Sequence, residues 1–211
     1  MYQPEHFKVG EADAVRAFIR AHPLGMLITG GARGLSANPL PMLLDSTPDG
    51  DVLRAHMARA NDQWKDIGGG ARVMVLFQGA DHYISPGWYA TKAETGQVVP
   101  TWNYLVAEVH GVAKVMNDPA WIGRQVADLT ASQEKAQPMP WTPEDAPPKF
   151  IDAQLRAIIG ISIEVTAMAG KFKLSQNRPA RDRQSVVGHL EEGDGKAADM
   201  AALIRSQISG D

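Results

Sequence analysis

The stretch RAHMARAND, residues 54–62, places cationic and amide side chains where an apolar strand ends and a short helix begins. Its polar side chains include Arg54, His56, Arg59 and Asn61. Backbone N–H groups at the start of a helix, combined with the forked donors of an arginine, suit a phosphate group. A solvated arginine beside a polar helix cap explains the same residues, so their chemistry alone leaves both interpretations open.

A second candidate region is YISPGWYATKAETGQVVPTWNY, residues 83–104, which holds five of the fourteen aromatic residues of the chain. Trp88 and Tyr89 with Lys92, and Trp102 with Asn103, combine flat apolar surfaces with hydrogen-bond donors. Such a mixture suits a planar heterocycle or a dimer interface about equally. The rings alone do not decide between these two uses.

The third region is KFKLSQNRPARDR, residues 171–183, in which five cations accompany one aspartate. A nucleic-acid patch would need such cations on an open face. However, the whole tail from Lys171 to Asp211 has seven Lys and Arg against six Asp and Glu, a net charge of only +1. This balance argues against direct DNA reading by the tail.

Several kinds of chemistry are missing from the sequence. There is no cysteine, which excludes disulfides, thiolate metal sites and cysteine nucleophiles. GGARGL, residues 30–35, lacks the spacing of a dinucleotide-binding loop and is better interpreted as a hairpin turn. The six histidines show no close ligand spacing. We therefore predict no metal site, and the sequence assigns no catalytic residue.

The elements that must position these residues follow from periodicity and turn signals. We expect strands at 24–29, 35–44, 51–56, 72–77, 102–116 and 161–167, with Pro39 and Pro41 forcing an edge or a bulge in the second. Helices are expected at 11–22, within 58–70, at 118–134, from Phe150 through Ile159, and twice within 178–208. A proline-rich loop spans 137–149.

This order predicts a mainly β protein with peripheral helices, of the α+β class, built on an antiparallel barrel of six to seven strands. We expect residues 1–177 to form the barrel domain and 178–211 to form a helical extension packed on that domain. The net charge of −3 gives no general attraction to nucleic acid or membrane. No leader and no membrane span is evident, so the sequence predicts a cytoplasmic protein.

Five blocks of the sequence together resemble one family. They are MYQPEHF (1–7), RAHMARANDQW (54–64), YISPGWY (83–89), VVPTWNY (98–104) and KFKLSQNR (171–178). In this combination and order, from residue 1 to about 190, they resemble the PaiB-like proteins, described as FMN-binding negative transcriptional regulators.

The resemblance implies a split β-barrel related to the pyridoxamine-phosphate-oxidase and flavin-reductase group, assembled as a homodimer with FMN at the subunit interface. It implies that the flavin ring lies along Asn38-Pro39-Leu40-Pro41 and that the phosphate lies near His56, Arg59 and Asn61. It also implies contributions from the partner subunit in the region of Tyr83 to Trp102. The cofactor-binding residues expected in and next to this region are Tyr83, Ser85, Trp88, Lys92, Thr101, Trp102 and Asn103.

Three functions stay open at this point. The first is FMN binding coupled to transcriptional repression, with a DNA operator as a weakly supported partner. The second is a flavin-dependent oxidoreductase of the reductase or oxidase kind, with Trp88, Tyr89 and Trp102 around a small substrate and Tyr83, His82 or His110 as proton donor. The third is a barrel without flavin whose aromatic segment only forms a dimer interface.

Overall fold

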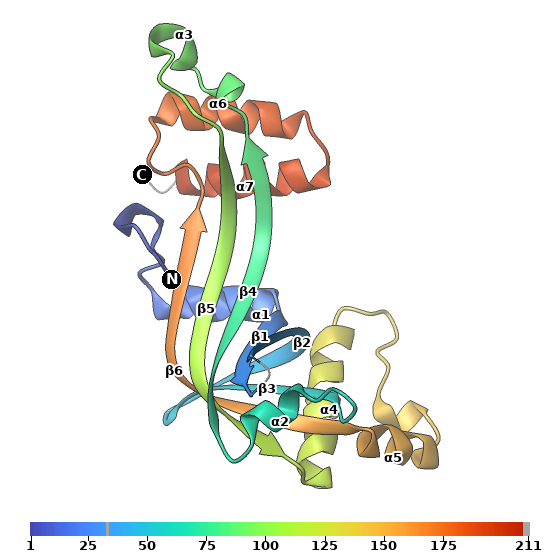
Figure 1. Ribbon diagram of the computed structural model, residues 1–211. Coiled ribbons are helices and arrows are strands. Elements are labelled where there is room, and N and C mark those ends of the chain that lie inside the picture. Colours follow the sequence, from blue (N-terminus) through green and yellow to red (C-terminus); the bar gives the residue numbers. More distant parts are fainter. Residues whose placement is uncertain (33, 209–211) are drawn as a thin grey trace. The chain divides into compact units, whose positions relative to one another are not determined.

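The computed structural model describes residues 1–32 and 34–208, and its internal contacts divide the chain into two compact units (Figure 1). Unit 1 comprises Met1–Val15, Gln78–Ala107 and Ala169–Asp211. Unit 2 comprises Arg16–Phe77 and Glu108–Met168. The N-terminal residues therefore share a unit with the C-terminal helices, although they are distant in the sequence.

Six strands occur in the described part of the chain. They are β1 (Leu24–Gly31), β2 (Gly34–Thr47), β3 (Gly50–Ala58), β4 (Ala71–Ile84), β5 (Thr101–Met116) and β6 (Ile158–Lys173). Their order is β1-β2-β3-β6-β5-β4. β4 pairs in turn with β1, since Leu76 to Met74 lie opposite Met26 to Ile28. The predicted antiparallel barrel with peripheral helices is thus confirmed.

The helices in the described part of the chain lie between and after these strands. They are η1 (Glu5–Phe7), α1 (Ala12–Ala21), α2 (Gln63–Ile67), η2 (Pro86–Trp88), α3 (Lys92–Thr95), α4 (Pro119–Glu134), η3 (Pro143–Asp145), α5 (Pro148–Arg156), α6 (Ala180–Glu191) and α7 (Gly195–Ile208). Asp118 caps α4 as expected, because its carboxylate accepts from the amides of Ala120 and Trp121. None of these helices is long and apolar enough to span a membrane.

The core of unit 2 uses the alternation of the barrel strands. Side chains two residues apart on each strand point inward, so Leu53, Ala55 and Met57 of β3 are buried, as are Ile161 and Ile163 of β6. The regular alternation that the sequence shows around residues 161–167 therefore marks a true barrel strand.

One predicted element is wrong at its end. The helix expected from Phe150 through Ile159 ends at Arg156, and Ile158 and Ile159 already belong to β6. These two β-branched residues pair with Ala58 and Met57 of β3. Their ladder bonds and burial in the sheet outweigh the helical spacing that linked them to Leu155.

Unit 1 contains the ends of the three long strands and the C-terminal helix pair. After β6 the chain makes a tight turn, in which Ser175 adopts a left-handed backbone conformation with φ of 64°. Gln176 stabilises the turn, because its side chain accepts from the Leu174 amide and donates to the Phe172 carbonyl. The turn leads into α6 and α7, which lie side by side (Figure 1).

Candidate functional site

The strands β2 and β3 separate halfway along β2. Residues 34–41 of β2 pair with β1, whereas the register with β3 covers only Met42–Thr47, opposite Ala55 to Gly50. The facing backbone edges at Asn38–Pro41 and at His56–Ala58 are therefore not paired with each other. The open edge that Pro39 and Pro41 predict is present, and it lies beside both predicted flavin segments of unit 2.

Gln63 of α2 closes one end of this split. Its side chain is buried, with 2% exposed, and its amide nitrogen donates to the carbonyls of Leu27 and Ser36 at 3.0 and 3.2 Å. Its side-chain oxygen accepts from Asn38 at 2.9 Å, and its backbone amide donates to the Asn61 side chain at 3.1 Å. The structure thus brings Asn38 and Asn61 together through a residue that sequence reasoning missed.

Pro39, Leu40 and His56, which are also predicted to bind the flavin, differ in the groups that they expose to a ligand. Leu40 points into the core and Pro39 is exposed, so Leu40 offers a ligand its backbone and Pro39 its ring. His56 is half-buried, and its Nδ1 atom is enclosed without a hydrogen-bond partner among the described residues. Burial lowers the pKa of His56 below its usual value, which favours the neutral form of its ring. An unpaired polar atom in this place fits a polar ligand.

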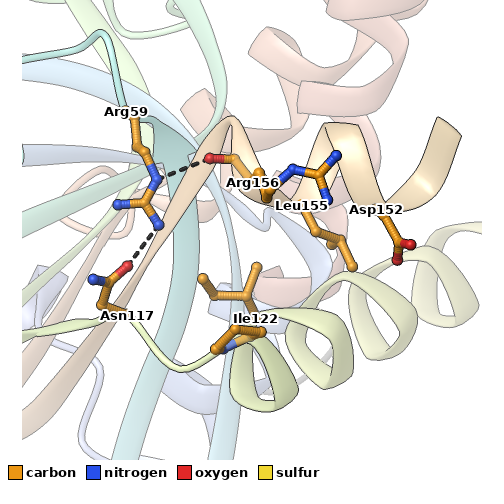
Figure 2. Close-up of a pocket in the computed structure, with 7 residues that line it drawn as sticks. Arg59, Asn117, Ile122, Asp152, Leu155 and Arg156 are labelled. Atoms are coloured by element: carbon orange, nitrogen blue, oxygen red, sulfur yellow. Dashed lines mark hydrogen bonds between the residues drawn. The ribbon is translucent and has the colours of Figure 1, made fainter. Parts of the chain in front are cut away.

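Arg59 turns its guanidinium toward the other edge of β3. Its Nε donates to the carbonyl of Arg156 at 2.9 Å and its Nη2 to the side-chain oxygen of Asn117 at 2.6 Å (Figure 2). Its backbone amide also donates to the carbonyl of Ala157, just before β6 begins. The Arg59 side chain is therefore fixed on the β6 side of β3, while Asn38 and Asn61 meet at Gln63 on the β2 side.

A pocket of about 570 Å³ opens beside Arg59. Apolar side chains from α4 and α5 form much of its wall, with polar groups of three different segments at its edge (Figure 2). The lining residues are Arg59, Asn117, Pro119, Ile122, Asp152, Leu155 and Arg156. Its size falls in the range of pockets that bind small molecules.

In unit 1, the predicted aromatic residues Tyr83 and Trp102 contact each other, whereas Trp88 contacts the rings of His82 and His189. Tyr83 and Trp102 meet edge to face with centroids 6.0 Å apart, and they are 41% and 53% exposed. Trp88 instead stacks on His189 of α6, with centroids 5.7 Å apart. Only the first pair therefore presents two exposed large rings to a partner or ligand.

The remaining predicted residues of unit 1 have mainly local contacts. Ser85 caps η2 by accepting from the Gly87 amide, and Lys92 lies exposed at the start of α3. Thr101 accepts from the Lys173 ammonium. Asn103 is fully buried and donates to Ser175 at 2.9 Å, which ties β5 to the left-handed turn after β6. Asn103 thus has a clear structural role in unit 1.

The cations of 171–183 do not form an open basic face. Lys171 is 9% exposed and lies over the rings of Tyr2 and Tyr104. Arg178 lies over the Tyr89 ring, and Arg181 forms a bidentate pair with Glu94. Burial and the charges of Lys171 and Arg178 lower the pKa of Lys173, despite the opposing effect of Tyr104. Because these cations are engaged within the protein, they are less available to bind the phosphates of a DNA backbone.

The chain is similar in sequence to several known proteins. A family profile described as "Putative FMN-binding domain" matches residues 1–167. The Bacillus subtilis protein named "Protease synthase and sporulation protein PAI 2" is 29% identical over 209 residues, which cover 99% of this chain and 98% of that protein. The match is therefore nearly end to end in both proteins.

Two solved structures share the fold. The flavocytochrome Anf3 from Azotobacter vinelandii superposes with a TM-score of 0.58 at 14% identity, over 79% of this chain and 69% of that chain. The FAD and heme binding protein from Mycobacterium smegmatis gives 0.55 at 15% identity, over 79% and 73%. At these identities the likeness concerns the split-barrel fold alone. The profile match over residues 1–167 and the end-to-end similarity to the Bacillus subtilis protein show that this protein belongs to the PaiB-like family, whose profile is described as "Putative FMN-binding domain".

Proposed function

We propose that the protein binds FMN at the split between β2 and β3. The observation that carries this proposal is the pair of unpaired backbone edges at Asn38–Pro41 and His56–Ala58. They offer hydrogen-bonding groups beside a side chain, Asn38, that Gln63 holds in place. FMN supplies redox chemistry when bound, and this chain's residues bind and orient it.

The phosphate is proposed to lie at the end of β3. Asn61 uses its side-chain oxygen on the Gln63 amide, which leaves its NH₂ group as a donor. His56 adds a ring nitrogen without a partner among the described residues. Arg59 adds positive charge at the same strand end, although two of its nitrogen groups are occupied. A phosphate site would account for all three of these residues. The alternative, a polar cap at the start of α2, accounts only for Asn61.

We further propose that the protein is a homodimer. On the outer face of the β1–β2 pair, exposed Leu24 and Met26 lie opposite Pro41 and Pro39, and Leu35 on the same strand pair is 83% exposed. Such a contiguous apolar strip is typical of an interface. In unit 1, the exposed rings of Tyr83 and Trp102 are the predicted residues best placed to reach a partner's flavin.

The first test is to add FMN to the purified protein and follow the quenching of flavin fluorescence, with the mass of the particle measured by light scattering. We expect saturable uptake of one FMN per chain by a dimer. A colourless protein that takes up no FMN would refute the proposal, and a monomer that still binds FMN would refute only the dimer.

The physiological output is proposed to be transcriptional repression, reached indirectly through a ligand or a protein partner. An indirect route is favoured because Lys171, Arg178 and Arg181, which direct DNA binding would use, are engaged by aromatic rings or a carboxylate of the protein itself. A gel shift with the upstream DNA of its own gene tests this. Salt-sensitive, sequence-dependent retardation by the protein alone would contradict the indirect route.

A second candidate is a flavin-dependent oxidoreductase. The exposed edge-to-face pair of Tyr83 and Trp102 favours it, since such a pair can cover one face of a planar substrate. His82 lies next to this pair along the chain, with its Nδ1 2.6 Å from the Tyr83 carbonyl. Rapid mixing of the FMN-loaded protein with NADH or NADPH separates the candidates, since a flavin that stays oxidised argues against a reductase.

A further inference from the structure

We propose that Lys173 is a reactive amine that binds small carbonyl acids, such as aldehyde acids and 2-oxo acids, as a reversible imine. The acid group of the ligand contacts Arg178 and Lys171, and its carbonyl carbon bonds to the Lys173 nitrogen. All three residues belong to unit 1. The proposal rests on their surroundings in that unit and does not depend on whether FMN binds at the split between β2 and β3.

Three cations surround the end of β6. Lys171 and Lys173 lie two residues apart on this strand, so their side chains extend from the same face. Both ammonium groups lie over the ring of Tyr104, at 5.4 and 6.0 Å from its centroid. Arg178 follows the tight turn after β6, and its guanidinium lies 4.5 Å from the ring centroid of Tyr89. Aromatic rings thus hold all three cations in place.

In the described part of the chain, no carboxylate pairs with these three cations. Asp182, the one acidic residue of 171–183, uses its two carboxylate oxygens to accept from the amide and the hydroxyl of Thr91. Lys171 is only 9% exposed, and a buried charge without an opposite charge is costly. An acid group on a ligand supplies the negative charge that this cluster lacks.

The Lys173 amine has neutral partners instead of a carboxylate. It lies 5.9 Å from the ring centroid of Phe7, and it donates to the hydroxyl of Thr101. Neither group balances a full positive charge, and the two neighbouring cations disfavour it further. A lysine that is partly desolvated beside other cations is an activated nucleophile, because more of it is present as the neutral amine.

The pKa of Lys173 agrees with these surroundings. Burial, together with the charges of Lys171 and Arg178, lowers this pKa below the ordinary lysine value, and Tyr104 opposes the shift. From η1, Lys173 is faced by the uncharged ring of Phe7. As the pH rises, Lys173 therefore loses its proton before an exposed lysine does.

Imine formation at Lys173 balances without a further reactant. The nitrogen lone pair adds to the carbonyl carbon, and the carbonyl oxygen takes up one of the amine protons. The second amine proton leaves with that oxygen as water, and a carbon–nitrogen double bond replaces the carbon–oxygen one. The Thr101 hydroxyl is hydrogen-bonded to the reacting nitrogen, so it is placed to relay these protons. Hydrolysis reverses the step.

The test uses glyoxylate as the carbonyl acid and propionaldehyde as its neutral counterpart. Each is added to the full chain with cyanoborohydride, which reduces an imine to a stable secondary amine, and peptide mass mapping gives the labelling rate of every lysine. Exposed Lys149 serves as the reference. The preference for Lys173 over Lys149 should be about tenfold greater with glyoxylate than with propionaldehyde, the effect of one charge-assisted hydrogen bond to the acid. The rate at Lys173 should also reach its half-maximum at a lower pH than the rate at Lys149.

Three variants separate the role of Arg178 from that of the fold. Arg178→Met should reduce the preference of glyoxylate for Lys173 to that of propionaldehyde, and Arg178→Lys, which keeps the charge, should restore part of it. Arg181→Met, at an exposed arginine paired with Glu94, should change neither reagent. Circular dichroism controls for folding, and the comparison of reagents and the pH profile need only the wild-type protein. Equal preference with both reagents, a pH profile at Lys173 like that of Lys149, or unchanged glyoxylate labelling in Arg178→Met would each overturn the proposal.

Discussion

Replacing Gln63 by methionine tests how the split between β2 and β3 is held. Methionine has a similar length and keeps the buried volume, but it makes no hydrogen bonds of this kind. The change removes three side-chain hydrogen bonds, two to the carbonyls of Leu27 and Ser36 and one from Asn38. The groups left behind are buried or partly buried, so water replaces the amide poorly.

The expected loss follows from these three bonds. At about 1 kcal/mol for each, the free energy of unfolding should fall by about 3 kcal/mol. With a urea dependence of about 2 kcal/mol/M, the midpoint of unfolding should move down by about 1.5 M. FMN affinity should also fall, because Asn38 loses the side-chain oxygen that holds it, whereas the backbone amide that binds Asn61 is kept. Both effects are measured by urea unfolding and by FMN titration of the same protein.

The matched control is Gln133→Met, at an exposed glutamine of α4 whose side chain donates a single hydrogen bond among the described residues, to the hydroxyl of Ser132. Its free energy of unfolding should stay within about 0.5 kcal/mol of wild type. If Gln63→Met were as stable as this control and bound FMN equally well, the assigned role of Gln63 in shaping the split would be refuted.

Three further predictions concern other parts of the molecule. Gly111→Ala should cost about 2 kcal/mol in urea unfolding, because its Cβ would lie 2.5 Å from a carbonyl oxygen of β6, whereas Gly188→Ala on α6 has open space and should not destabilise. Asn103→Leu should cost about 2 kcal/mol by leaving the buried Ser175 hydroxyl unpaired, and an unchanged midpoint would contradict this. Burial lowers the pKa of His56 from 6.5, so as the pH falls the unfolded chain takes up a proton on this side chain before the folded chain does. The free energy of unfolding should therefore decrease as the pH drops through and below 6.5. His56→Gln should lose that part of the pH dependence.

The sequence predicts the local elements of unit 2 well, because their signals are local. Hairpin turns separate β1, β2 and β3, and the alternation around Ile161 marks β6. Asp118 followed by Pro119 sets the start of α4. The open edge at Pro39 and Pro41 also follows from one elementary fact, that proline has no N–H to donate. These features need no knowledge of distant contacts.

The parts that sequence reasoning misses depend on contacts between distant segments. The pocket is lined by Arg59, which follows β3, by Asn117, which follows β5, and by Arg156, which precedes β6. These three residues are distant in the sequence, and the order of the strands brings them together. In the sequence, Gln63 is one polar residue in a short polar segment. In the structure it is buried and forms hydrogen bonds with both Asn38 and Asn61. A signal for Gln63 would have been its position on the helix face turned toward β1.

Hydrogen–deuterium exchange of the full chain, with and without FMN, tests the central claim most directly. If FMN lies along the open edges of β2 and β3, the backbone amides within 36–41 and 56–63 should become protected when it is added, since these segments are unpaired on one edge or bear the proposed contacts. Amides of α6 and α7 serve as internal references and should not change. FMN uptake with protection confined to other segments, or no FMN uptake, would contradict the proposed site.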